Sequence, residues 1–250
     1  MTINSSSKKF IVSGCSFSAI QDTGREWPRL FMTHLPDYTL INKSVISRGN
    51  GLISRAVIYE VQTQLQNGVL PEDILVAVQW SGWDRHENHV LLKEQELSFE
   101  PVFDEKTGET WYSHRVQSFI DDIPNSWEIY NPHWENKNCK VYYSRYYSET
   151  GKLIESLEDI LRTQWFLEKH NIKYFMTTMI KFPDSCDETE HLFQMIDKSK
   201  FLPIPGMLEW GISTGLPLRD DWHISIEQNG IFVDTIVLPF LINTGISVSL

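Results

Sequence analysis

Residues 10–20 read FIVSGCSFSAI, and this stretch decides the fold class. A short apolar run ends abruptly in Gly14, Cys15 and Ser16, which are small or turn-forming residues. A run of this length and composition is typical of a strand that is covered on both faces. The turn after it brings a serine hydroxyl to the edge of a sheet, which is one way to mount a nucleophile and is equally an ordinary strand-to-helix turn.

Strands of the same kind recur along the chain and alternate with helical segments. The short apolar runs are residues 9–13, 39–42, 74–80 and 174–179. The segments with a helical pattern are residues 25–35, 51–67, 151–171, 188–200 and 226–238. This alternation predicts an α/β fold, a three-layer α/β/α arrangement of flavodoxin-like type around a central parallel sheet.

The alternation breaks between residues 84 and 147, where Trp and Tyr are frequent. Neither a Ser/Gly linker nor a repeat sets this region apart. We therefore expect a single α/β domain over residues 1–250, with an aromatic-rich insertion at residues 84–147 above the carboxyl ends of the strands. A second irregular stretch, residues 201–225, is rich in Pro and Gly, and long ordered loops of this kind are often functional.

Composition limits the classes of function. The formal net charge is −11, and no Lys/Arg block offsets it, so nucleic acid is not expected as a partner. The chain has 22% charged and 41% hydrophobic residues, as ordinary folded proteins do, and no apolar stretch long enough to cross a membrane. The first residues lack the apolar run of a signal peptide, so the cytoplasm is the expected location.

Three widely spaced cysteines, Cys15, Cys139 and Cys186, form no C-x-x-C pair. An odd number of this kind fits a reducing compartment better than a disulfide framework, so free thiols are expected. Cys15 follows a strand whose alternate side chains point inward, which favours a buried thiol over a nucleophile.

A second polar motif lies near the other end of the chain. Asp220, Asp221, Trp222 and His223 come directly before the last predicted helix. A histidine that acts as a general base needs one ring nitrogen for the nucleophile and an acceptor on the other nitrogen, which either aspartate could supply. Asp and His before a helix also serve as a simple N-terminal cap, so this motif alone does not decide between the two roles.

Taken together, a Gly-x-Ser after the first strand and an Asp-x-x-His before the last helix resemble the SGNH/GDSL hydrolase superfamily. The overall pattern, including WSGWDR at residues 80–85 and the proline of IVLPFL at residues 236–241, is similar to that of divergent members found in tailed-phage genomes. The resemblance implies that Ser16 is the nucleophile and His223 its base, without a cofactor. It assigns the aspartate three residues before the histidine, Asp220, to hold His223, and Asp221 is the competitor for this role.

The middle motifs of the family match less closely. After the second strand the family has a glycine whose N–H faces the oxyanion, and the sequence offers Ser47, Gly49 and Asn50 here. After the third strand the family reads Gly-x-Asn-Asp, whereas residues 79–85 read QWSGWDR and lack the asparagine. One oxyanion donor is typically worth about 3–4 kcal/mol of transition-state stabilisation, so a substitute among Gln79, Ser81 and Arg85 would be needed.

The resemblance implies a serine esterase or deacylase that acts on a small-molecule or glycan ester. Trp80, Trp83, Trp222 and the aromatic residues of the insertion offer stacking faces for sugars, which favours an O-acetyl group on a glycan. The same aromatic residues are also typical of an accessory core or of a homo-oligomer interface. The alternative function is a catalytically inactive SGNH-fold binding or structural module of a phage, in which case the protein is a virion component.

A short histidine pair calls for a separate interpretation. Residues 86–89 read His-Glu-Asn-His, which on a helix has the spacing of metal ligands. No third ligand is placed near it by the sequence, and such pairs arise readily by chance. We therefore predict that the chain holds no metal.

Overall fold

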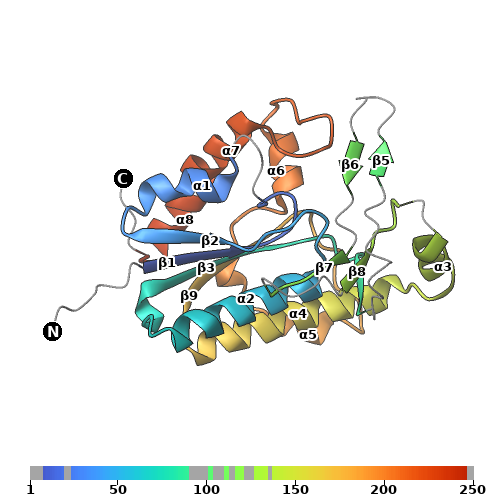
Figure 1. Ribbon diagram of the computed structural model, residues 1–250, viewed down its shortest axis with the longest axis horizontal. Coiled ribbons are helices and arrows are strands. Elements are labelled where there is room, and N and C mark those ends of the chain that lie inside the picture. Colours follow the sequence, from blue (N-terminus) through green and yellow to red (C-terminus); the bar gives the residue numbers. More distant parts are fainter. Residues whose placement is uncertain are drawn as a thin grey trace.

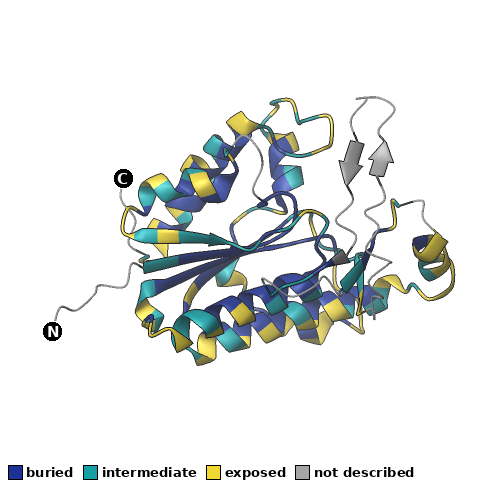
Figure 2. Cartoon of the chain, viewed as in Figure 1, coloured by how far each residue is buried: buried dark blue, intermediate teal, exposed yellow. Residues whose placement is uncertain are grey.

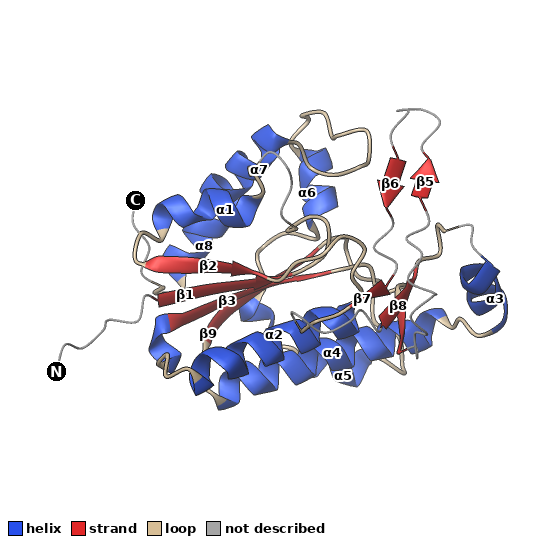
Figure 3. Cartoon of the chain, in the orientation of Figure 1, coloured by secondary structure: helices blue, strands red, loops and turns tan. Residues whose placement is uncertain are grey.

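The computed structural model describes residues 8–19, 24–89, 101–103, 110–112, 116–120, 127–134 and 137–246. A four-stranded parallel sheet of order β2-β1-β3-β9 forms its centre. Its strands are β1 (Lys8–Ser13), β2 (Tyr38–Asn42), β3 (Ile74–Trp80) and β9 (Lys173–Thr178). Helices cover both faces of this sheet, as Figures 1 and 3 show, so the predicted three-layer α/β fold is confirmed.

Two helical layers sandwich the sheet. One face is covered by α1 (Trp27–Phe31), α6 (Met207–Ser213), α7 (Ile226–Phe232) and α8 (Leu238–Asn243). The other face is covered by α2 (Asn50–Gln66), α4 (Glu149–Lys169) and α5 (Glu190–Met195). Short 3₁₀ turns follow or precede these elements at Met32–His34, Pro71–Asp73 and Lys198–Lys200.

Successive side chains along a central strand point to opposite faces of the sheet, so the sheet contributes side chains to two hydrophobic cores. Phe10 and Val12 of β1 point to the layer of α1 and α7, whereas Ile11 between them points to the layer of α2 and α4. All three side chains are fully buried. Figure 2 shows the centre of the sheet as deeply buried and the edge strand β2 as partly exposed, which explains why β1, β3 and β9 read as apolar runs without polar alternation.

The predicted helices are found, with two differences in length. The segment at 188–200 forms only α5 and a 3₁₀ turn, because the chain leaves the helix at Ile196 in an extended conformation. The last helix is longer than predicted, since α7 continues through a π-helical turn (Val233–Val237) into α8. The widened turn lies just before Pro239, which has no N–H to continue the regular α-helical ladder.

The region between β3 and α4 contains short elements of its own. They are β4 (His86–His89), β5 (Pro101–Phe103), β6 (Thr110–Tyr112), β7 (Val116–Gln117), β8 (Trp127–Tyr130) and α3 (Lys137–Arg145). Strands β4, β8 and β7 form an antiparallel sheet, and β5 pairs with β6. These elements lie beyond the carboxyl ends of the central strands (Figure 1), and residues 90–100, 104–109, 113–115, 121–126 and 135–136 of the predicted insertion at 84–147 lie outside the described residues.

The helical interpretation of residues 86–89 is wrong, because they form strand β4. On a strand, side chains three positions apart point to opposite faces, so His86 and His89 cannot share a ligand. His86 stacks on Tyr142, and the ring of His89 meets Trp127 edge to face. Among the described residues, no helix is long and apolar enough to cross a membrane.

Candidate active site

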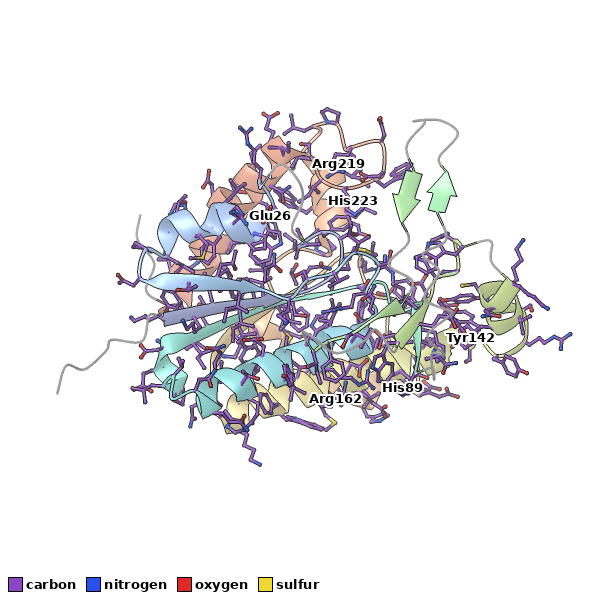
Figure 4. All side chains as sticks on the ribbon, viewed as in Figure 1. Glu26, His89, Tyr142, Arg162, Arg219 and His223 are labelled. Atoms are coloured by element: carbon purple, nitrogen blue, oxygen red, sulfur yellow. The ribbon has the colours of Figure 1, made fainter. Side chains whose placement is uncertain are left out.

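Ser16 and His223 meet at the carboxyl edge of the central sheet. The Ser16 Oγ lies 2.6 Å from the His223 Nε2, although the two residues are 207 positions apart. Ser16 lies in the turn after β1, and His223 lies in the loop between α6 and α7 (Figure 4). The geometry is that of a hydroxyl nucleophile paired with a base, since this separation is within the hydrogen-bond range required for proton transfer.

The Ser16 turn is held by a buried amide at the end of β3. Gln79 is fully buried, and its Oε1 accepts a hydrogen bond of 3.0 Å from the Cys15 N–H and one of 3.3 Å from the Ser18 hydroxyl. The Trp27 indole N–H donates to the Ser18 hydroxyl at 2.8 Å, and the Asn42 side-chain amide donates to the Ser18 carbonyl at 2.8 Å. Three neighbouring elements thus fix the backbone around Ser16.

Gly14 is required because the same amide passes very close to the chain. A Cβ at position 14 would lie 2.8 Å from the Gln79 Oε1 and 3.1 Å from the Gln79 backbone oxygen. Both contacts are tighter than a methyl group and an oxygen tolerate in a packed interior. The glycine is therefore needed for close approach of two strands, and Cys15 beside it is a buried thiol that contacts the Gln79 Oε1 at 3.3 Å.

Asp221, and not Asp220, is the carboxylate in contact with the histidine. The Asp221 Oδ1 and the His223 Nδ1 are 3.1 Å apart, and the Asp221 backbone oxygen is at the same distance from this nitrogen. The expectation that Asp220 holds His223 is therefore wrong. Trp222 between them adopts a left-handed backbone with φ of 64°, which reverses the chain and brings Asp221 back to the ring while Asp220 stays exposed.

The loop that carries His223 is closed by its own hydrogen bonds. The Arg219 N–H donates to the His223 carbonyl at 2.9 Å, and the Trp222 N–H donates to the Arg219 carbonyl at 3.0 Å. The Arg219 guanidinium pairs with the Asp221 Oδ2 at 3.0 Å, which leaves Oδ1 for the histidine. Arg219 and His223 lie together on this loop in Figure 4, and Phe17 packs on the imidazole with ring centroids 4.7 Å apart.

Burial sets the protonation state of the base. The side chain of His223 is 20% exposed, and burial lowers its pKa below the usual 6.5, although the Asp221 carboxylate acts in the opposite direction. A lowered pKa keeps the imidazole neutral at pH 7. A neutral Nε2 can accept the Ser16 proton, so the electrostatics agree with the geometry.

Three of the residues expected to meet an oxyanion, Asn50, Gln79 and Ser81, are engaged elsewhere or buried. The Asn50 Oδ1 accepts from the Ser81 N–H at 2.8 Å, and the Asn50 amide donates to Ser156. The Gln79 amide group donates to the Trp80 carbonyl at 2.6 Å. The Ser81 hydroxyl is completely buried, so a substrate cannot reach it.

Gly49 has a different purpose from the one expected. A Cβ there would lie 2.7 Å from the Glu87 Oε1, and Gly51 also makes room for this carboxylate. The Glu87 Oε1 accepts from the Leu52 N–H at 2.9 Å at the start of α2. A carboxylate at a helix N-terminus satisfies an unpaired N–H there, so the glycines of this loop fit a structural contact.

The Ser16 turn and the loop after β2 carry backbone N–H groups that make no hydrogen bond among the described residues. The Val45 N–H donates to the Gly14 carbonyl at 3.1 Å, so this loop runs beside the Ser16 turn. Ser47 lies in the same loop in a left-handed conformation with φ of 65°. Within the part of the chain that the structure describes, the N–H groups of Ser16 and Ser47 make no hydrogen bond and are available to a ligand.

Arg85 is the predicted donor with a charged side chain that reaches this edge. Its Nη1 lies 3.1 Å from the Arg48 carbonyl, and its Nη2 lies 3.7 Å from the Met179 sulfur. Met179 in turn contacts the Cys15 thiol at 3.5 Å. Arg85 therefore lies one side chain away from the nucleophile turn.

The tryptophans named from the sequence separate into buried and exposed ones. Trp80 is fully buried, and Trp83 is partly buried against Phe182. Trp222 is 69% exposed beside His223. In the insertion, Tyr130, Tyr142 and Tyr143 pack on one another, which fits an accessory core.

Sequence reasoning named Asp221 as the second candidate for holding His223, named Gln79 only as a possible oxyanion donor and missed its positioning role, and assigned no role to Phe17. Gln79 is the polar residue near the end of an otherwise apolar strand, and this was the available signal. A metal centre has no support among the described residues, since no group of three His, Cys, Asp or Glu side chains converges there.

Comparison with known proteins gives a likeness of fold alone. No family model matches this chain, and no curated protein matches it. A crystal structure of TesA is similar, with a TM-score of 0.48 and 12% sequence identity over 94% of this chain and 98% of that chain. The interpretation of the site therefore depends on its own geometry.

Proposed function

We propose that the protein is a serine hydrolase of the SGNH type that cleaves carboxylic esters. The observation that carries this proposal is the 2.6 Å contact between the Ser16 Oγ and the His223 Nε2, with the Asp221 carboxylate on the opposite ring nitrogen. A hydroxyl, a neutral imidazole and an acceptor in this order form the arrangement that activates serine nucleophiles on unrelated folds.

The chemistry follows from the positions of the three side chains. The Ser16 Oγ attacks the ester carbonyl while the His223 Nε2 takes the hydroxyl proton, and the Asp221 carboxylate stabilises the resulting imidazolium. Collapse of the tetrahedral intermediate breaks the bond to the alkoxy group, which leaves as an alcohol with the proton from His223. Water activated by the same histidine then releases the acid from Ser16.

The oxyanion is assigned to backbone donors. The N–H groups of Ser16, in the nucleophile turn, and of Ser47, in the neighbouring loop after β2, make no hydrogen bond among the described residues and are the donors that we assign. Fixed donors of this kind stabilise developing charge better than mobile ones, because they need no reorganisation during the reaction. The strained left-handed backbone of Ser47 is consistent with a donor held in place for function.

For the substrate we retain an O-acetyl or similar ester on a glycan. The exposed indole of Trp222 supports it, since a large apolar ring next to the base is typical of a surface on which a sugar stacks. Its left-handed backbone is a strained conformation for a bulky residue, and such strain is concentrated at functional sites.

The proposal is tested by hydrolysis of 4-nitrophenyl acetate and of acetylated sugars. Ser16→Ala and His223→Ala should each lower kcat/KM at least about a thousandfold in folded protein. Ser185→Ala, at an exposed serine far along the chain, is the matched control and should keep full activity. Equal activity in Ser16→Ala and wild type would refute Ser16 as the nucleophile, and no hydrolysis by folded wild-type protein would support the rival, a binding or structural module without catalysis.

A further inference from the structure

The guanidinium of Arg85 bridges segments that follow the two outer strands of the central sheet. It contacts the Arg48 carbonyl in the loop after β2 and the Met179 sulfur just after β9. Strands β1 and β3 lie between β2 and β9 in the sheet. Because all four strands are parallel and end at the same edge, the guanidinium lies above the ends of β1 and β3, where Ser16 is mounted.

The charge of Arg85 is poorly compensated in this position. A guanidinium carries five N–H donors, and here its acceptors are one backbone carbonyl and one thioether, which is a weak acceptor. Within the described ranges, no carboxylate oxygen lies within 4.0 Å of Arg85. A half-buried cation without a counter-ion is costly, so an anion supplied from outside would be bound favourably.

Unlike Arg85, the neighbouring arginines are paired with carboxylates or surrounded by several hydrogen-bond acceptors. Arg85 shares a polar cavity of about 250 Å³ with Arg55 and Arg162, but Arg55 pairs with Glu87 and Arg162 pairs with Asp159. The Arg48 guanidinium is enclosed by the Gln117 side chain and by backbone carbonyls. Three of the four carboxylates that line this cavity, Glu87, Glu155 and Asp159, are therefore paired with Arg55, Lys152 and Arg162, and the fourth, Glu158, is not within 4.0 Å of Arg85.

We propose that Arg85 binds an anionic group of the substrate, so that the preferred ester carries a carboxylate or a phosphate close to the bond that is cleaved. This inference rests on the proposed esterase function and specifies its substrate class. Arg85 is then a specificity residue, and the oxyanion is met by backbone N–H groups. The overall charge of −11 would repel anionic substrates elsewhere, which makes one local cation at the site decisive for them.

The test uses two ester pairs that differ by one negative charge. On the acyl side, mono-4-nitrophenyl succinate is compared with 4-nitrophenyl butyrate, and on the alcohol side, 4-acetoxybenzoate is compared with phenyl acetate. In at least one pair, we expect Arg85→Gln to lower kcat/KM for the anionic ester about tenfold or more, mainly through KM, and to leave the neutral ester unchanged. Arg85→Lys should retain a weaker preference, and Arg29→Gln, which removes an ion-paired arginine in α1, should change neither.

If Arg85 acted on the oxyanion, Arg85→Gln would instead lower kcat equally for the charged and the neutral ester, and this result would overturn the inference. An unchanged preference for the charged ester would overturn it as well.

A second experiment separates the anion site from the esterase function. Calorimetry measures ester binding to Ser16→Ala and to the double variant Ser16→Ala with Arg85→Gln. If no ester is hydrolysed but Ser16→Ala binds the anionic ester through Arg85, the esterase function fails and the anion site stands. If neither ester binds selectively, the anion site is refuted.

Discussion

At the scale of single residues, the site depends on which aspartate reaches His223. The Asp221 Oδ1 is 3.1 Å from the His223 Nδ1, and the left-handed backbone of Trp222 makes this two-residue contact possible. The resemblance to the SGNH/GDSL family favoured Asp220, three positions before the histidine, and left Asp221 as the competitor. Local backbone reversal at a non-glycine residue is not encoded in a recognisable pattern, so the pairing could not be predicted.

The contact between Asp221 and His223 predicts that substitution of Asp221 lowers activity more than substitution of Asp220. Asp221→Asn should reduce kcat/KM for 4-nitrophenyl acetate about tenfold or more, because the acceptor that orients the imidazole and stabilises the imidazolium is weakened. The effect is smaller than for a buried triad aspartate, since Asp221 is 38% exposed and solvent screens its charge. Asp220→Asn is the matched control, and a larger loss in Asp220→Asn than in Asp221→Asn would contradict the assignment.

The lowered pKa of His223 predicts the pH dependence of activity. Burial shifts the pKa below 6.5, so the neutral base persists to lower pH than a free histidine allows. The kcat/KM profile for a neutral ester should fall on the acid side with a midpoint below 6.5 and be flat from there to pH 8. A midpoint above 6.5 would show that the Asp221 charge outweighs burial.

At the scale of elements, the turn after β1 is built by packing between neighbouring strands. The strands β1, β3 and β9 were predictable because they are largely buried on both faces and read as apolar runs, and the edge strand β2 was predictable from its short apolar run although it is only partly buried. The helices α2, α4 and α7 were predictable from their periodicity and lie within two residues of the expected starts. The short strands of the insertion were not, because their pairing depends on partners distant in sequence, as β4 with β8 illustrates.

The close contact between Gly14 and Gln79 predicts that a larger residue at position 14 lowers both stability and activity. Gly14→Ala should lower the free energy of unfolding by about 1–3 kcal/mol and reduce esterase activity, because the new methyl group collides with Gln79 and displaces the Ser16 turn. Urea unfolding and ester hydrolysis measure the two effects. Gly230→Ala in α7 is the control, since a Cβ there meets nothing within 4 Å, and this variant should be as stable as wild type or more so.

At the scale of the whole molecule, the parallel sheet is what unites a serine from the first strand with a histidine from the last loop. The strand order places β1 at an inner position, so its carboxyl end is flanked by loops from every layer. Ligand sites of open α/β folds lie at such edges, which is why motif order alone predicted that Ser16 and His223 meet. The oxyanion donors were not predictable, because backbone N–H groups leave no signature in side-chain identity.

Glu87 connects strand β4 of the insertion with helix α2 of the central domain. Its side chain is 7% exposed and pairs with Arg55 at 3.4 Å, and burial raises its pKa from 4.5 to about 7. A raised pKa means that the folded state holds the proton more tightly than the unfolded state. The stability that this provides is therefore complete below about pH 4.5 and is lost as the pH rises to 7.

Glu87→Gln should remove this dependence. We compare the free energy of unfolding of wild type with that of Glu87→Gln. Relative to the variant, wild type should lose about 3 kcal/mol of stability between pH 4.5 and pH 8, because one pKa unit corresponds to 1.36 kcal/mol. Titrating groups that do not interact with Glu87 are present in both proteins and cancel in this difference, whereas Asp159 is coupled to Glu87 and contributes to it. Urea denaturation at the two pH values measures it, and parallel pH profiles would show that Glu87 is ionised in both states.

The central claim is that His223 activates Ser16, and the most direct measurement is covalent labelling with a fluorophosphonate probe read by intact mass. The account predicts one adduct on wild type, no adduct on Ser16→Ala, and an adduct that forms far more slowly on His223→Ala. Absence of an adduct on folded wild-type protein, or an adduct that persists in Ser16→Ala, would contradict it.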